Sequence, residues 1–201
     1  MKIFCVGLNY KEHIVEMKHF AFPENLVIVI RPRTALLKNG QPYYYHVFSS
    51  DVHYEGEIVL RVCKNGKKID QKFAHKYYDA FTLGFDFTAR DIQAEQKKKG
   101  WPWEIAKGFD GSAFIGDFIP LEKEKVISFT IKKNNEVVQQ GDTSMLIFSF
   151  DEIISYISKF FTLQQGDLIY TGTPQGVGPV QIGDVLEGRV EDQLIVKCEI
   201  K

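Results

Sequence analysis

Two glutamates separated by a single residue are the first feature of this chain that could do chemistry. Glu55 and Glu57 stand just before an apolar run that includes Ile58 and Leu60. Alternation along a strand would send both carboxylates to one face and both apolar side chains to the other. The two carboxylates repel each other there, and a hard divalent cation with oxygen ligands would remove that repulsion. The pattern indicates either a metal site or a solvated polar face.

A third acid, Asp86, lies within the apolar segment Leu83-Gly84-Phe85-Asp86-Phe87. Because aspartate is disfavoured inside strands, we expect it to have a specific partner, either as a third metal ligand or as a cap of the following helix. Arg90 and Gln93 lie three residues apart on that helix and share a face directed back towards Asp86. A guanidinium and an amide there would suit a substrate carboxylate beside a metal. Lys97 continues this face, but the triplet 97–99 is interpreted as a solvated helix end.

His13 and Glu16, at positions i and i+3 of a predicted helix, form a second candidate pair. A carboxylate that holds one imidazole nitrogen leaves the other free to accept a proton from water. Such a pair, taken alone, is equally typical of a surface contact. His53, beside the two glutamates, is either another polar contact in the site or a loop residue.

Residues 171–179 form a loop rich in glycine and proline, Thr171-Gly172-Thr173-Pro174-Gln175-Gly176-Val177-Gly178-Pro179. It is neither a P-loop nor a dinucleotide-binding loop, because the Gly-Lys-Ser/Thr and Gly-x-Gly-x-x-Gly patterns are missing. Thr173 and the backbone N–H groups can still bind a small anion. A plain tight turn would explain the glycines but not the threonines.

The elements that must position these residues are mainly strands. Helices are predicted over Tyr10–Met17, Thr88–Lys99 and Asp151–Phe161. Asn9 and Glu12 would form a capping box for the first helix, and Thr88 would cap the second. In the third helix, Ile153, Ile157 and Phe160 are interpreted as core. Asn65-Gly66 predicts a hairpin between 58–63 and 67–70, and Asn134-Asn135 predicts one between 128–132 and 137–140. Further predicted strands cover residues 2–8, 26–30, 81–87, 168–170, 185–190 and 194–200. With no repeat or linker, we predict one β-dominated α+β domain over residues 1–201.

Composition excludes several classes of protein. The 201 residues carry 25 Lys+Arg and 26 Asp+Glu, a net charge of −1 that argues against nucleic-acid binding. The apolar run Leu26–Ile30 is far shorter than the ~20 residues of a membrane span, and the start lacks a signal-peptide stretch. Three scattered cysteines, Cys5, Cys63 and Cys198, fit a reducing compartment and exclude a thiol-rich zinc site. We therefore expect a cytoplasmic protein without nucleic-acid or membrane partners.

Five motifs occur in a fixed order along the chain. They are His13-Ile14-Val15-Glu16, His53-Tyr54-Glu55-Gly56-Glu57, Asp86-Phe87-Thr88-Ala89-Arg90-Asp91-Ile92-Gln93, Pro102-Trp103-Glu104-Ile105-Ala106-Lys107 and the loop at 171–178. Each motif is weak alone, but their order and spacing are specific. Over essentially its whole length the chain resembles the fumarylacetoacetate hydrolase family, in particular its short single-domain members.

The resemblance implies a fold, a metal and roles for individual residues. It implies a mixed β-roll of curled sheets, and members of the family are usually homodimers. It also implies that Glu55, Glu57 and Asp86 are ligands of Mg²⁺ or Mn²⁺. His13 and Glu16 match a dyad that activates water on a mobile lid, here 9–24. Arg90, Gln93, Lys107 and Thr173 match positions around an α-keto acid, with Lys107 taken as catalytic. Arg31 replaces a lysine common in relatives, and we expect it to stabilise substrate charge, although arginine releases a proton far less readily.

The predicted reaction is metal-dependent hydrolysis of a C–C bond in a 3-acylpyruvate, through an enolate that the metal stabilises as a Lewis acid. Decarboxylation of oxaloacetate, or isomerisation or decarboxylation of a dienoate from aromatic catabolism, would use the same site. A third alternative is a non-catalytic β-rich binding module whose acids are merely solvated.

Overall fold

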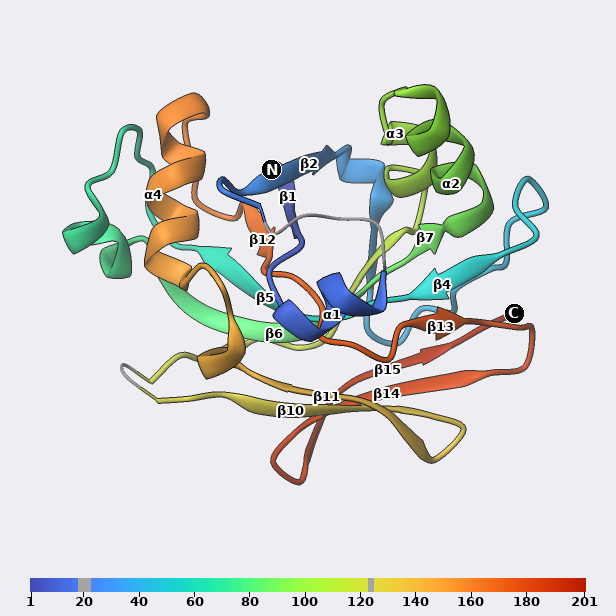
Figure 1. Ribbon diagram of the computed structural model, residues 1–201. Coiled ribbons are helices and arrows are strands. Elements are labelled where there is room, and N and C mark those ends of the chain that lie inside the picture. Colours follow the sequence, from blue (N-terminus) through green and yellow to red (C-terminus); the bar gives the residue numbers. More distant parts are fainter. Residues whose placement is uncertain (18–22, 123–124) are drawn as a thin grey trace.

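The computed structural model describes residues 1–17, 23–122 and 125–201, and most of its regular structure is strand (Figure 1). The strands are β1 (Ile3–Gly7), β2 (Val27–Arg31), β3 (Leu36–Lys38), β4 (Val52–Tyr54), β5 (Gly56–Val62), β6 (Tyr78–Asp86), β7 (Thr88–Ala89), β8 (Ala113–Ile115), β9 (Ile119–Pro120), β10 (Ser128–Lys133), β11 (Glu136–Asp142), β12 (Leu168–Tyr170), β13 (Gly178–Pro179), β14 (Val185–Val190) and β15 (Gln193–Glu199). The helices are α1 (Lys11–Glu16), α2 (Arg90–Lys99), α3 (Glu104–Lys107) and α4 (Phe150–Phe160), with 3₁₀ turns η1 (Arg33–Ala35), η2 (Gln71–Lys76) and η3 (Thr143–Met145).

The largest sheet has eight strands and mixed pairing. Its order is β2-β1-β12-β5-β6-β8-β3, with β9 also paired to β6. β1 and β12 run parallel, whereas β5 and β6 run antiparallel over most of their length. α4 stands at one end of this sheet, and α2 and α3 stand at the other (Figure 1). The predicted fold class, a β-dominated α+β roll of curled mixed sheets, is confirmed.

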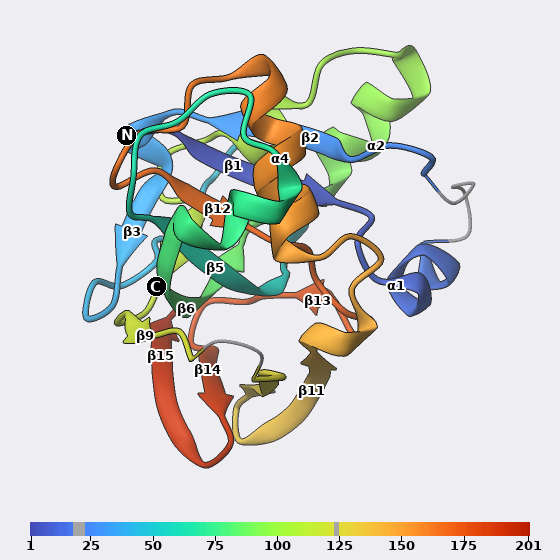
Figure 2. The ribbon, with the colours of Figure 1, turned by 90° about the vertical axis from the view of Figure 1, so that its left-hand side faces the viewer.

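A second sheet, β11-β10-β14-β15, lies beneath the large one in both views (Figures 1 and 2). The two sheets bury the core between them. Leu83 of β6, Ile131 of β10 and Leu186 of β14 all have no exposed surface. The close packing favours a glycine at 188, because a Cβ there would lie 2.6 Å from Val196 Cγ1 and 3.1 Å from Leu83 Cδ1. A small third sheet, β13-β4-β7, completes the roll beside the candidate site.

Of the two predicted hairpins, one is confirmed and one is wrong. Asn134 and Asn135 both have positive φ, 51° and 71°, and they connect the antiparallel strands β10 and β11. Asn65-Gly66 does not close a hairpin, because β5 pairs with the nine-residue, largely apolar β6 instead. The segment 67–70 holds a single apolar residue and offers β5 much less surface to pack against than β6 does.

The predicted helix starts are partly wrong. Asn9 does not cap α1; its buried side chain accepts from Phe148 N and donates to Phe148 O and Thr171 O. Thr88 belongs to β7, and Ala89 precedes α2.

The helix predicted over Asp151–Phe161 has a cap that sequence reasoning missed. Ser149 and Glu152 form a capping box at the start of α4. Ile153 and Ile157 are buried as predicted, whereas Phe160 is 60% exposed and is not core.

Candidate active site

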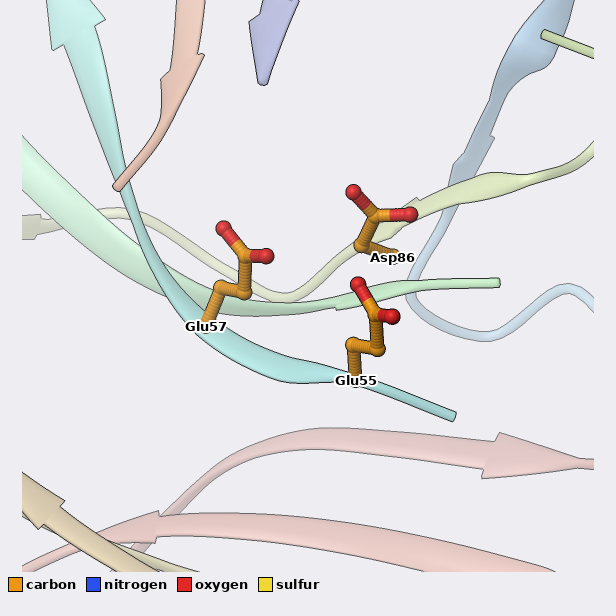
Figure 3. Close-up of side chains that lie close together, drawn as sticks. All are labelled: Glu55, Glu57 and Asp86. Carbon is orange, nitrogen blue, oxygen red and sulfur yellow. The ribbon is translucent and has the colours of Figure 1, made fainter. Parts of the chain in front are cut away.

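Three buried carboxylates gather where β5 and β6 run side by side. Glu55 lies between β4 and β5, Glu57 is the second residue of β5, and Asp86 ends β6 (Figure 3). Asp86 N donates to Glu55 O at 2.8 Å, and Glu57 faces Gly84 in the register. Opposed residues of an antiparallel pair project to the same side, so the three side chains converge. One oxygen from each lies within 4.8 Å of the others, and none of the three residues is more than 5% exposed.

Three basic side chains surround these carboxylates. Lys107 Nζ donates to Glu55 Oε2 at 2.7 Å and to Asp86 Oδ1 at 3.0 Å. Arg90 donates to Glu55 Oε1 at 2.6 Å and to Gln93 Oε1 at 2.9 Å. Arg31, at the end of β2, is 1% exposed, pairs with Asp86 and donates to Ser112 O. Asp86 is therefore held by ion pairs and does not cap a helix.

The electrostatics of Glu55 and Glu57 differ. Burial opposes ionisation of Glu55, but the charges of Lys107 and Arg90 outweigh it and hold the pKa of this carboxyl well below its ordinary value. Burial and the neighbouring charges of Asp86 and Glu55 raise the pKa of Glu57 well above its ordinary value. Gly172 N donates to Glu57 Oε2 at 2.8 Å and offsets only part of this effect. Glu57 is thus the acid whose charge is poorly compensated.

The donor set and the charges fit a hard divalent cation. All three candidate ligands are carboxylates, which Mg²⁺ and Mn²⁺ prefer. Within the described residues, Asp86 Oδ1 and Glu57 Oε2 accept the hydrogen bonds made to these two carboxylates, so the other oxygen of each can bind a cation. Once the cation has displaced the proton from Glu57, the three ionised acids balance Arg31, Arg90 and Lys107, and a divalent cation with a dianionic ligand leaves the site neutral.

Metal binding should release a proton. Because the pKa of Glu57 is raised, the metal-free protein carries a proton there at pH values where an ordinary glutamate is ionised, and the cation must displace it. We expect affinity for Mg²⁺ or Mn²⁺ to rise with pH up to that raised pKa and then to level off. Calorimetry in buffers of different ionisation enthalpy measures the released proton; an enthalpy independent of the buffer would contradict this prediction.

His13 and Glu16 are also brought together, on α1. His13 Nδ1 lies 3.1 Å from Glu16 Oε2, and a carboxylate only accepts, so Nδ1 carries the hydrogen and Nε2 is left as the acceptor. A positive charge on His13 would lower the pKa of Glu55, which shows that the imidazole lies near the carboxylates. Glu16 Oε1 accepts from Gly176 N at 3.0 Å, which ties α1 to the glycine-rich loop.

The glycine-rich loop contributes backbone as well as side chains. Thr171 Oγ1 donates to Ile58 O and Thr173 Oγ1 to Gly56 O, both at 2.9 Å, so the threonines fasten the loop to β5. Gly172 has φ +104° and Gly176 has φ +97°, conformations that favour glycine. These turns aim one N–H at Glu57 and the other at Glu16. Thr173 is buried next to the triad, with its hydroxyl engaged by protein groups.

Sequence reasoning missed Gln139 of β11. Its side chain accepts from Gly56 N and donates to Thr173 Oγ1 and Pro174 O, which joins the second sheet to the site. A buried glutamine in a strand is a weak signal, since nothing local indicates its distant partners.

His53, left open between two roles, lies on β4 and pairs with Asp51 at 2.9 Å. Burial and the charge of Arg90 lower the pKa of His53.

Comparison with known proteins matches this arrangement to one family. Residues 2–201 match the family described as fumarylacetoacetate (FAA) hydrolase C-terminal. The chain belongs to the fumarylacetoacetate hydrolase family. It is 39% identical over 202 residues to the mitochondrial oxaloacetate tautomerase FAHD1 of Mus musculus, covering 99% of this chain and 91% of that protein. It is 39% identical over 189 residues to oxaloacetate tautomerase YcgM of Escherichia coli, covering 92% and 86%.

Solved structures of family members have the same fold. The fumarylpyruvate hydrolase of Pseudomonas aeruginosa, in complex with Mn²⁺ and pyruvate, superposes with a TM-score of 0.91 at 33% identity, covering 100% of this chain and 90% of that one. A 2-hydroxyhepta-2,4-diene-1,7-dioate isomerase of Mycobacterium marinum has a TM-score of 0.86 at 31% identity, covering 99% and 73%.

The cellular location stays a prediction. None of the helices within the described ranges is long and apolar enough to cross a membrane. Several relatives are named as mitochondrial, so the cytoplasmic location predicted from composition is not tested by these similarities.

Proposed function

We propose that this chain is a Mg²⁺- or Mn²⁺-dependent enzyme that interconverts the enol and keto forms of oxaloacetate or a closely similar dianionic 2-keto acid. The observation that carries the proposal is the charge balance of the buried site. Glu55, Glu57 and Asp86 would hold the cation, and the two charges of a keto diacid would then restore neutrality. The names of the FAHD1 and YcgM relatives support the same substrate. When bound, the cation would supply a Lewis acid for the keto oxygen.

The basic side chains would orient the substrate. Arg90 and Gln93 present a guanidinium and an amide from one face of α2, an arrangement suited to a carboxylate. Lys107, 7% exposed and fixed on the short α3, would stabilise negative charge that develops on the substrate oxygen. Arg31 lies deeper and would act by neutralising Asp86. The chain would thereby stabilise the enolate, which carries one negative charge more than the keto form.

The His13–Glu16 dyad would move the proton. Glu16 holds Nδ1, so Nε2 can take a proton from the substrate carbon next to the keto group, and the enolate oxygen would then take a proton from solvent to give the enol. In the reverse direction the enol oxygen would lose its proton to solvent and His13 would return a proton to the carbon. We also infer that the segment 9–24 acts as a lid over bound substrate, with residues 18–22 outside the described part of the chain. Asn9 anchors the start of this segment to Phe148 and Thr171, and Glu16 latches it to Gly176.

Hydrolysis of 3-acylpyruvates is a second candidate activity, supported by the likeness to fumarylpyruvate hydrolase. His13 would deprotonate a water, whose oxygen adds to the distal carbonyl. The C–C bond next to that carbonyl then breaks, its electron pair forms the pyruvate enolate, and protonation of carbon yields pyruvate and a carboxylic acid. The same dyad would serve both reactions, with water present only in the second.

A direct assay separates these activities. Purified protein with Mg²⁺ or Mn²⁺ should accelerate the loss of the ultraviolet absorbance of enol-oxaloacetate, and a chelator should abolish the acceleration. Pyruvate formed from oxaloacetate would indicate decarboxylation, and loss of acetylpyruvate absorbance would indicate hydrolysis. If enol-oxaloacetate is lost no faster than in buffer with the metal alone, the proposal is wrong, and unchanged acetylpyruvate would exclude the second activity. Pairing of two copies, which the family resemblance implies, can be measured by light scattering on the same preparation.

A further inference from the structure

A buried glutamine of the second sheet links two parts of the site that are far apart in the chain. Gln139 of β11 is 2% exposed. Its Oε1 accepts from Gly56 N at 2.8 Å, and its Nε2 donates to Thr173 Oγ1 and to Pro174 O, both at 2.9 Å. Gly56 separates the two candidate glutamate ligands at the start of β5. One amide side chain therefore joins the ligand-bearing turn to the glycine-rich loop.

The orientation of this amide is fixed by the chemistry of its partners. The backbone N–H of Gly56 can only donate and the carbonyl of Pro174 can only accept, so Oε1 and Nε2 cannot exchange places. Thr173 Oγ1 gives its own hydrogen to Gly56 O at 2.9 Å and accepts from Nε2. Gly56, Gln139 and Thr173 thus form a closed ring of three hydrogen bonds. Loss of one member leaves buried polar groups unpaired.

Close packing of β11 against the site leaves this ring little room to move. A Cβ on Gly56 would overlap the Ile131 side chain and would lie 2.9 Å from Gln139 Oε1. A Cβ on Gly176 would collide with Val138 O and would lie 3.2 Å from Gln139 Cγ. The two glycines thus allow the turn and the loop to lie directly on the second sheet, on either side of Gln139.

The same loop holds the His13–Glu16 dyad. Gly176 N donates to Glu16 Oε1 at 3.0 Å, and Glu16 Oε2 holds His13 Nδ1. Gln139 fixes this loop at Thr173 and Pro174, just before Gly176. A shift of the loop at Gln139 would therefore move the dyad relative to the carboxylates, and proton transfer is sensitive to displacements of about 1 Å.

We propose that Gln139 is a positioning residue that sets the placement of the His13–Glu16 dyad relative to the carboxylate triad. The inference rests on the proposed function, because it takes His13 as the group that moves the proton. Both amide hydrogens of Gln139 are used by protein groups, so the residue acts through Gly56 and the loop and not on the substrate itself. A purely structural glutamine would affect unfolding but not the kinetic constants of the folded protein.

Gln139→Met keeps the length of the side chain and removes all three hydrogen bonds that the amide makes. The kcat for oxaloacetate enol–keto interconversion should fall by about 10–100-fold. KM should change far less, and Mn²⁺ affinity measured by calorimetry should stay within about threefold, because Glu55 and Glu57 keep their own partners. Gln140→Met, the same change at the exposed next residue of β11, should alter none of these quantities.

Urea unfolding establishes that each variant is folded before its kinetics are compared. If Gln139→Met does not fold, Gln139→Asn takes its place, since it retains the amide but is one carbon too short to reach both Gly56 and Thr173. An unchanged kcat in the folded variant would overturn the proposal. A loss of metal affinity equal to the loss of kcat would also overturn it, because Gln139 would then support the metal ligands alone.

A double variant tests whether Gln139 acts through the dyad. Glu16→Ala removes the hydrogen bond that ties α1 to Gly176. In that background, Gln139→Met should lower kcat by a smaller factor than it does in the wild type, because the dyad is no longer held by the loop. The same factor in both backgrounds would contradict a role through the dyad.

Hydrogen exchange of the metal-free protein separates this inference from the proposed function. Gln139→Met should speed amide exchange in residues 55–57, in residues 172–176 and in α1, whereas Gln140→Met should not. Unchanged exchange in these segments would overturn the role of Gln139 alone. Wild-type protein that does not interconvert the forms of oxaloacetate would overturn the proposed function, and this inference with it.

Discussion

Replacing Glu57 by glutamine should weaken Mg²⁺ or Mn²⁺ binding on the order of 100-fold and at the same time stabilise the metal-free protein. The side chain keeps its size but loses its charge. Burial and two neighbouring carboxylates raise the pKa of Glu57, which means that its ionised form destabilises the fold. Glutamine removes this destabilisation of the fold, and it also removes the carboxylate that would bind the metal.

The size of the stability change depends on pH. An unfolded glutamate ionises near its ordinary pKa, whereas the folded Glu57 resists ionisation until the raised value. The advantage of Glu57→Gln should therefore grow as pH rises from the ordinary pKa and level off above the raised one. At neutral pH we expect about 1 kcal/mol or more, measured by urea unfolding with a chelator present.

Glu136→Gln is the matched control, since Glu136 is an exposed glutamate at the start of β11. It should change neither metal affinity nor unfolding. A Glu57→Gln protein that binds the cation as tightly as the wild type would exclude Glu57 as a ligand. A less stable metal-free variant would show instead that its carboxylate is well compensated by Gly172 and Lys107.

Replacing His13 by alanine should lower kcat for oxaloacetate enol–keto interconversion by about 10²–10⁴-fold and leave metal affinity unchanged. The imidazole contacts Glu16 and is not part of the carboxylate triad. Loss of the proton acceptor therefore affects proton transfer and not the assembly of the site. Stopped-flow absorbance of the enol measures kcat, and calorimetry with Mn²⁺ measures the affinity.

Two further variants sharpen this experiment. Glu16→Gln should lower kcat less than His13→Ala, because the imidazole remains but its tautomer and orientation are no longer held. His75→Asn removes a histidine from η2, far in the sequence from the dyad, and should leave kcat unchanged. Full activity in His13→Ala would assign proton transfer to another group.

Local sequence signals predicted elements wherever neighbours in the chain decide the structure. Asn134 and Asn135 adopt positive φ by their own chemistry, and Ile153 and Ile157 recur at the helical period. The Asn65-Gly66 signal is equally strong, yet the hairpin fails because β6 is a longer and more apolar partner for β5. Asn9 resembles a helix cap but is used for long-range bonds to Phe148 and Thr171.

The acidic residues of the site follow from local pattern, but their partners do not. Alternation places Glu55 and Glu57 on one face of a strand, and the aromatic surroundings of Asp86 indicate that it needs a partner. Lys107 and Arg31 were assigned only through the family resemblance. Lys97 was interpreted as part of a solvated helix end, whereas it is half-buried in a groove between α2 and Trp103.

The sequence by itself determined the strand-rich composition, the acidic motif and the helix that carries Arg90 and Gln93, since these depend on residue type and on periods of two and 3.6 residues. Only the tertiary structure decided which cation neutralises which carboxylate, and that Glu57 is the least compensated of the three. Those pairings join β2, β6, α3 and the residue that precedes β5, segments far apart in the chain. The energy of a buried charge depends on such distances and on exclusion of water, neither of which a local pattern contains.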